Sequence, residues 1–455
     1  MNTPIADFID RYIESGTVRF HMPGHKGKGS IEKYDITEID GADVLYSADG
    51  IINESENNAS SLFCTAHTFY STEGSTLAIK AMLTIATKGK NRKILAARNV
   101  HKAFIYGCAL LDLYVEWLLP EKFSHLCSCI IDAEDVERTL SNMEELPCAV
   151  YITSPDYLGN IADIEGIANV CKSYGVPLLV DNAHGAYLKF LSPSLHPMDL
   201  GAAMCTDSAH KTLPVLTGGA YLHISKDFPN FANNARSALS LFASTSPSYL
   251  IMRSLDQCNG YLAESFSKEL CDCIERTAAA KAKLITMGYT VMDTEPLKIV
   301  IDAKKSGYRG DSLGDILRGC GIECEFCDCD YTVIMTSPKN CESDFEKLIV
   351  ALGNVIQKDH IADTDFAISG ISQVMSIREA IFADSERVST DNALERICAS
   401  PTVSCPPAVP IVISGERIDS NHIELFKHYG IETVEVVKEK KKIYNFKKHI
   451  DIPKQ

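Results

Sequence analysis

A lysine that follows a short apolar run stands among the residues that could do chemistry. Ser208-Ala209-His210-Lys211 begins two positions after Ala202–Thr206, which we expect to be a buried strand. A buried ammonium group is costly to keep charged, so such a lysine is ion-paired, solvated at the strand end, or a nucleophile with a lowered pKa. Taken alone, Lys211 fits the solvated position best, because lysines are mostly exposed.

Three other segments place polar groups at the expected ends of strands. Ser75 and Thr76 follow a glycine at the start of a predicted helix, a setting that suits an anion. His101 lies at a strand-to-helix turn, and Asp181 directly follows the apolar run Pro177–Val180. Each segment alone has an ordinary explanation: a helix cap, a solvated histidine or a salt-bridged carboxylate.

In chain order, these segments supply a phosphate site, a ring-stacking residue, an acceptor for a protonated ring nitrogen and an amine for imine formation. Pyridoxal 5′-phosphate requires this set of partners. Ligands bind at the carboxyl ends of parallel strands, where all four segments are expected to meet. Because the four occur together, the sequence predicts a pyridoxal-phosphate enzyme that uses Lys211, His101 and Asp181 in catalysis.

The elements that would position these groups alternate between short apolar runs and helical stretches. Strands are expected at Lys93–Ala97, Tyr114–Leu118, Cys148–Thr153, Pro177–Val180 and Ala202–Thr206. Helices are expected at Ser75–Thr87, Lys102–Leu111, Ala133–Met143 and Ile164–Ser173. This alternation indicates βαβ units, and so an α/β fold with a mostly parallel sheet and helices on both faces.

We expect four divisions of the chain. They are an N-terminal segment (1–59), a large cofactor-binding domain (60–262), a small α+β domain (263–360) and a C-terminal domain (361–455). The first begins with a predicted amphipathic helix over residues 3–15, then a turn-rich basic loop. A polar segment with little periodicity follows through Asn58.

Composition limits the classes of partner. The 455 residues include 60 acidic and 44 basic side chains, for a net charge of -16. This balance argues against nucleic acid or an anionic membrane as a partner and is compatible with a cationic substrate. No apolar run is long enough to span a bilayer and no secretory signal is present, so we expect a cytoplasmic protein whose 17 cysteines are mostly reduced.

Several motifs resemble those of the Orn/Lys/Arg decarboxylase family, which has the fold type I (aspartate-aminotransferase-like) architecture. Residues 20–27 match the family's F-H-x-P-G-H-K-G, residues 181–185 match D-x-A-H-G, and residues 208–211 match S-x-H-K. Further similar stretches are 245–249, 375–380, 405–410 and 415–418. The likeness covers nearly the whole chain. It leaves no room for the N-terminal receiver-like domain of the long forms, so the chain resembles the short form.

The resemblance implies a role for each matching residue. Lys211 would carry the cofactor, Asp181 would pair with its ring nitrogen, and His101 would stack on the ring with His184 beside it. The phosphate would be held by Ser75, Thr76, Ser208 and His210. Ser246 or Ser248 would reach the cofactor of the neighbouring subunit, so the active form would be a homodimer or a higher oligomer.

The resemblance also implies the reaction and the substrate class. Loss of CO2 from a basic amino acid would be followed by return of a proton to Cα from Lys211 or His101. Glu325 and Asp328 would bind the basic end of the substrate. Arginine is favoured, because short forms often serve polyamine synthesis, and lysine and ornithine stay open. Many family members carry glutamine where Gly218 stands, and residues 42–46 also depart from the family pattern.

Three alternatives remain. Another pyridoxal-phosphate reaction, such as transamination or a lyase reaction, is compatible with the same fold. A non-catalytic binding protein is disfavoured by the intact lysine, aspartate and phosphate set. An iron–sulfur protein is suggested by the spacing of Cys320, Cys324 and Cys327, although that motif normally follows the first strand of a barrel. Apart from this alternative, we expect no metal site.

Overall fold

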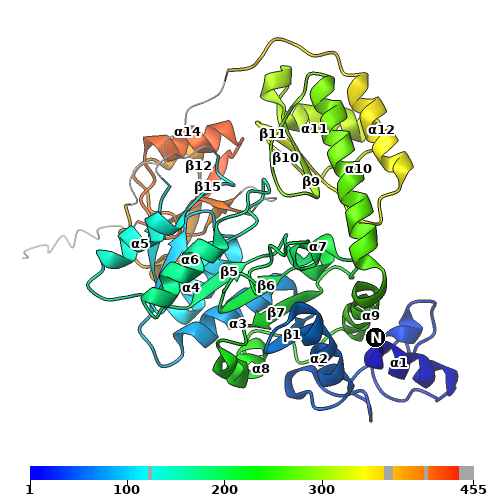
Figure 1. The fold of residues 1–455 in the computed structure, drawn as a ribbon. Helices are drawn as coiled ribbons and strands as arrows, with labels where there is room; N and C mark the ends of the chain where they lie inside the picture. The colour runs from blue at the N-terminus through cyan, green and yellow to red at the C-terminus, as the bar shows by residue number, and fades with distance from the viewer. Residues whose placement is uncertain (121–124, 363–371, 404–407, 440–455) are drawn as a thin grey trace, which may run out of the picture.

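The computed structural model describes residues 1–455 apart from 121–124, 363–371, 404–407 and 440–455 (Figure 1), so part of the 405–410 motif lies outside the described residues. A seven-stranded sheet has the order β1-β7-β6-β5-β4-β2-β3. Its strands are β1 His67–Ser71, β2 Lys93–Ala97, β3 Tyr114–Leu118, β4 Ala149–Thr153, β5 Leu178–Asp181, β6 Met204–Asp207 and β7 Ala220–Ile224. Strands β2 to β6 pair in parallel, and β7 is antiparallel to both β6 and β1. The predicted mostly parallel α/β fold is confirmed.

Both faces of this sheet are covered because its strands are apolar on both sides. Side chains alternate along a strand, so Ile94 joins the core on one face and Leu95 joins the core on the other. The helices of this domain are α3 Gly74–Thr87, α4 Lys102–Leu111, α5 Ala133–Ser141, α6 Ile164–Ser173, α7 Ala209–Thr212, α8 Ala232–Ser240 and α9 Tyr249–Glu264. Helices α3, α4 and α8 contribute to the first core, and α5 and α6 contribute to the second.

The N-terminal segment contains α1 Pro4–Glu14 and α2 Ile51–Phe63, with short 3-10 helices η1 Glu32–Tyr34 and η2 Leu45–Ser47 between them. Helix α2 occupies the polar stretch that showed little periodicity. Its buried face includes Ser55 and Glu56, so polar contacts replace part of the apolar stripe that marks most helices. The backbone N–H of Ala6 in α1 donates to Asp256 of α9 over 2.9 Å, which fastens α1 to the large domain.

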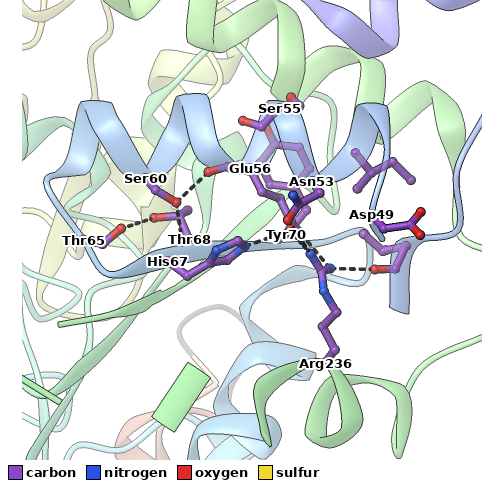
Figure 2. Close-up of polar contacts among 12 residues, drawn as sticks. Asp49, Asn53, Ser55, Glu56, Ser60, Thr65, His67, Thr68, Tyr70 and Arg236 are labelled. Carbon is purple, nitrogen blue, oxygen red and sulfur yellow. Dashed lines mark hydrogen bonds and ion pairs between the residues drawn. The ribbon is translucent and has the colours of Figure 1, made fainter. Parts of the chain in front are cut away.

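The carboxylate of Glu56 is fully buried and is neutralised by its neighbours, as Figure 2 shows. Arg236 of α8 donates to Glu56 Oε2 over 2.6 Å, and His67 Nε2 lies 3.0 Å from the same oxygen. The other oxygen accepts from the backbone N–H of Tyr70 over 3.0 Å. Because a buried charge is tolerated only when it is paired and hydrogen-bonded, this network fixes α2 against β1 and α8.

The small domain follows the long helix α10 Phe266–Thr286 (Figure 1). A four-stranded antiparallel sheet has the order β10-β11-β9-β8, and α10, α11 and α12 share a core with it. The remaining elements are β8 Thr290–Val291, β9 Lys298–Asp302, α11 Gly310–Gly319, β10 Phe326–Cys327, β11 Tyr331–Met335 and α12 Glu342–Gly353.

The C-terminal elements lie against the large domain (Figure 1). They are α13 Ile377–Phe382, β12 Ser385–Ser389, β13 Thr402–Val403, β14 Pro410–Val412, α14 Ser420–His428 and β15 Thr433–Val437. A buried ion pair joins Arg98 at the end of β2 to Glu416, with 3.0 Å between Nη2 and Oε2. Arg98 also donates to the backbone carbonyls of Pro410 and Ile411. Within the described residues, no helix has the length and apolar character needed to cross a membrane.

Candidate active site

A cavity of about 390 Å³ opens at the carboxyl ends of the parallel strands. Its lining brings together most of the residues that the sequence singled out: Ser75, Thr76, His101, Asp181, His184, Ser208, His210 and Lys211. They come from the ends of β2, β5 and β6 and from the start of α3. Parallel strands bring their carboxyl ends to one edge of the sheet, which explains why segments far apart in the chain converge here.

Lys211 lies in the short helix α7, directly after β6. Its Nζ atom lies 2.9 Å from Nε2 of His184. Burial lowers the pKa of the Lys211 amine, while the carboxylates of Asp181 and Glu325 act in the opposite direction. A lysine with a lowered pKa has a larger fraction of free amine, the form that attacks a carbonyl.

Asp181 is the last residue of β5 and is 2% exposed. Burial raises the pKa of its carboxyl, and the nearby Lys211 opposes that rise. The Tyr151 hydroxyl donates to one carboxylate oxygen over 3.2 Å, and the backbone N–H of Ala183 donates to the other over 3.3 Å. These bonds hold the carboxylate in the cavity wall, where a cation would stabilise it further.

The hydroxyl groups of Ser208 and Ser75 lie 2.9 Å apart at the N-terminus of α3. The loop that follows α7 and contains Gly218 lies against the start of α3. The backbone N–H of Gly74 donates to Gly218 O over 2.7 Å. Gly218 has φ +98, and a Cβ there would lie 3.0 Å from Thr72 O. A residue with a side chain at position 218 therefore does not suit this backbone.

Two of the histidines are held neutral. His101 caps α4, because its Nδ1 accepts from the backbone N–H of Ala103 over 3.1 Å. Burial lowers the pKa of His101 to about 4, helped by Lys211 and Lys102. Burial and Lys211 also hold the pKa of His184 well below its usual value.

His210 is anchored to the same glycine-containing loop that crosses the start of α3. Its Nδ1 lies 2.9 Å from the carbonyl oxygen of Gly219. A carbonyl oxygen only accepts, so Nδ1 of His210 carries the proton. Burial lowers the pKa of His210, so a neutral ring is favoured.

The cavity also contains residues that sequence reasoning missed. Tyr157 packs edge-on against His184, with 4.9 Å between ring centroids, and its hydroxyl donates to Glu325 Oε1 over 2.8 Å. Tyr157 follows the end of β4, a strand-end position that could have marked it as a candidate. Ala408 and Val409 of the C-terminal domain also line the cavity, and the carbonyl of Ala408 accepts from Lys102 N–H over 2.9 Å.

Four predicted residues are not part of this cavity lining. Glu325 is connected to it through Tyr157. Asp328 instead shapes the turn between β10 and β11: it accepts from two backbone N–H groups of that turn and lies 3.0 Å from His125 Nε2. Ser248 caps α9 by accepting from the backbone N–H of Ile251, and Ser246 is exposed.

The three cysteines of the iron–sulfur alternative lie in the small domain. Cys320 is exposed at the end of α11, whereas Cys324 and Cys327 are half-buried and interact with each other. Among the described residues, the groups of three or more side chains that could hold a metal ion do not include these cysteines. The structure therefore gives no support to a cluster at this position.

The fold and the cavity together define an enzyme of the fold type I class. The chain resembles the E. coli constitutive lysine decarboxylase, with a TM-score of 0.78 at 16% identity, covering 96% of this chain and 82% of that one. It is 28% identical over 460 residues to the arginine decarboxylase of Bacillus subtilis, covering 94% of this chain and 93% of the relative. It is also 28% identical over 454 residues to the arginine decarboxylase of Halalkalibacterium halodurans, covering 92% of each.

Family models extend the same assignment along the chain. The model of the Orn/Lys/Arg decarboxylase major domain matches residues 3–306, and the model of the family's C-terminal domain matches residues 367–434. The chain belongs to the Orn/Lys/Arg decarboxylase family. The resemblance seen in the motifs and the prediction of a decarboxylase are confirmed.

Proposed function

We propose that this enzyme is a pyridoxal-phosphate-dependent decarboxylase of basic amino acids, with arginine as the favoured substrate, releasing CO2 and the corresponding amine. One observation carries the proposal: a lysine with a lowered pKa and a buried carboxylate line the same cavity at the strand ends. Family membership supports loss of CO2 over transamination or a lyase reaction on the same fold. Similarity to arginine decarboxylases supports arginine over lysine and ornithine.

The residues of the cavity suit the cofactor. Asp181 is a buried carboxylate that a protonated ring nitrogen would stabilise, and Lys211 would bind the aldehyde carbon. The hydroxyls of Ser75 and Ser208, together with the N-terminus of α3, suit a phosphate. Bound there, pyridoxal phosphate would supply an electron sink for the pair left by departing CO2.

The protein would supply proton control. Both Lys211 and His101 are candidates to return a proton to Cα, and the pKa of about 4 leaves little protonated His101 near neutral pH. We therefore assign this role to Lys211, whose Nζ is positioned by His184 Nε2 over 2.9 Å. Tyr157 would hold His184 through its edge-on ring contact.

Two further parts of the proposal concern assembly and location. A homodimer or higher oligomer would bring Ser246 or Ser248 to the cofactor of a neighbouring subunit. The aromatic side chain of Phe20, in the N-terminal loop, is 93% exposed in the single chain. This exposure supports a subunit interface that covers the side chain. We also propose a cytoplasmic location, which the predominance of unpaired cysteines supports.

The test is release of CO2 from carboxyl-labelled arginine, lysine and ornithine by purified enzyme with added pyridoxal phosphate. We expect release from arginine at the highest kcat/KM, together with the absorbance band of a lysine-linked cofactor that is lost in Lys211→Ala. A normal band without CO2 release from any of the three would refute decarboxylation while leaving cofactor binding intact. Absence of the band would refute the cofactor.

A further inference from the structure

A second cavity of about 410 Å³ lies beside the first one, and Asn99 and Thr153 line both. One side is the loop that follows β4, including Asp156. The other is the segment 293–296 of the small domain, which comes shortly before β9. The cavity is therefore bounded by two domains and touches the active-site wall.

Four side-chain oxygens in this lining are buried and have no hydrogen-bond partner among the residues that the structure describes. They are Asn99 Oδ1, Thr153 Oγ1, Thr294 Oγ1 and Glu295 Oε1. Asn99 and Glu295 are each only 3% exposed. Buried polar atoms are almost always hydrogen-bonded, so four unpaired oxygens at one cavity indicate a missing partner. The amide oxygen of Asn99 and the carboxylate oxygen of Glu295 only accept, and the two hydroxyls can accept as well, so a partner that donates hydrogen bonds satisfies all four.

The charges of the lining also favour a cation. Asp156, Asp293 and Glu295 line the cavity, and the described residues of the lining include no lysine or arginine. The nearby ammonium groups of Lys281 and Lys298 donate to backbone carbonyls, those of Glu295 and Asp156 respectively. Lys298 Nζ also forms a buried ion pair with Glu295 Oε1 at 3.7 Å, a distance too long for a hydrogen bond, so this oxygen can still accept one.

Glu295 is held in place independently of any ligand. Its Oε2 accepts from the backbone N–H of Leu297 over 3.0 Å and from the Tyr187 hydroxyl. Oε1 is left at the cavity. The second carboxylate of the loop, Asp156, is occupied by Asn160, which donates to it from both backbone and side chain.

We propose that this cavity binds an organic ammonium or guanidinium group. The inference rests on the proposed function for the origin of that group, which has two sources: the distal end of the amino-acid substrate, or a free amine such as the reaction product. Both present several N–H donors on a cation, which matches the unpaired oxygens and the carboxylates.

Two substitutions test the cavity without disturbing its framework. Thr294→Val keeps the side-chain shape and removes an oxygen that has no hydrogen-bond partner, and Asp293→Asn removes a charge from an exposed position. The matched control is Asp272→Asn, which makes the same charge change on the exposed face of α10. Thermal unfolding of each variant confirms that it is folded.

The first measurement is calorimetric titration of the holoenzyme with 1,4-diaminobutane and with agmatine. We expect Thr294→Val to weaken binding by about tenfold, because a hydrogen bond to a charged group is lost, and Asp293→Asn to weaken it by about two- to fivefold, because an exposed ion pair is lost. The Asp272→Asn control should bind like the parent enzyme. This titration needs no turnover, so it remains decisive even if the proposed reaction fails.

The second measurement separates the two sources of the cation. If the substrate's distal group enters the cavity, KM for the amino acid should rise about tenfold in Thr294→Val and about two- to fivefold in Asp293→Asn, while kcat stays within about twofold in each. If a free amine binds on its own, the Kd of the diamine should rise while KM stays unchanged. Unchanged KM and unchanged amine binding in both variants would overturn the proposal, whether or not CO2 is released.

Discussion

Lys211 Nζ and His184 Nε2 lie 2.9 Å apart, and burial lowers the pKa of both groups. A free amine and a neutral imidazole can each donate or accept in this contact. The other ring nitrogen, Nδ1, is buried and has no hydrogen-bond partner among the described residues. The pair therefore couples the reactive amine to a ring whose second nitrogen is held away from solvent.

Replacing Lys211 should abolish the reaction. Lys211→Ala removes both the carrier of the cofactor and the proposed proton donor, so we expect CO2 release to fall by at least roughly 10³-fold. Lys172→Ala, at an exposed lysine of α6, is the control and should behave like the parent enzyme. Comparable rates for the two variants in a CO2 release assay would contradict the assignment.

Asp181→Asn should separate stability from activity. The carboxamide retains an oxygen for the Tyr151 hydroxyl. It carries no charge for burial to destabilise, so thermal stability should be unchanged or higher. The rate of decarboxylation should fall by roughly 10²-fold or more, since a charge that stabilises the reacting state is removed. Retention of the parent kcat would show that Asp181 does not act on the cofactor ring.

His101 should make the protein less stable in acid. Folding lowers the pKa of His101 from 6.5 to about 4, so between these values the unfolded chain binds more protons at this position. The free energy of unfolding should then decrease as the pH falls through this window, by at most about 1.4 kcal/mol per pH unit from this residue. His101→Asn keeps a helix-capping side chain and should show a weaker pH dependence in urea unfolding. Equal slopes in the two proteins would count against this effect.

The buried ion pair between Arg98 and Glu416 should matter much more than an exposed one. Arg98→Met leaves a buried carboxylate unpaired and should lower the free energy of unfolding by about 3–5 kcal/mol. Arg92→Met, which breaks the exposed pair with Asp112, should cost only about 0–1 kcal/mol. Chemical denaturation measures both, and similar costs would refute the distinction.

Gly218→Ala should be costly for two reasons. Its φ of +98 disfavours any Cβ, and that Cβ would also approach Thr72 O to 3.0 Å. Gly175→Ala is a matched control with φ +69 and no atom within 4 Å of the added Cβ, so strain alone should cost about 1–2 kcal/mol there. We expect a larger loss of stability and weaker cofactor binding for Gly218→Ala alone, measured by denaturation and by titration with pyridoxal phosphate.

The residues brought together in the active-site cavity were predictable because their positions depend on local patterns. Lys211, Asp181 and His101 each follow an apolar run, and a parallel sheet gathers such positions at one edge. Helix α2 was not recognised, since it buries Ser55 and Glu56 rather than an apolar stripe. Ala408 reaches the cavity through docking of a distant domain, which no local pattern records.

The two predicted substrate-binding residues do not line the cavity, because their positions depend on how the domains pack rather than on a local pattern. Glu325 is connected to the site by its hydrogen bond with Tyr157, a contact between two domains, and by its charge, which acts on Lys211. Asp328 has the right charge, but its oxygens accept hydrogen bonds from the turn that contains it. The unpaired oxygens near Glu295 lie where the loop after β4 packs against the small domain, and no local sequence pattern predicts that packing.

The bond between Ala6 and Asp256 spans 250 positions of the chain. During synthesis at about 5–20 residues per second, the N-terminal helix is therefore made roughly 12–50 seconds before its acceptor. In that interval the apolar face of α1, with Ile5 and Ile9, has no surface of α9 to cover it. The contacts that hold α1 in place can therefore form only after most of the large domain has been synthesised.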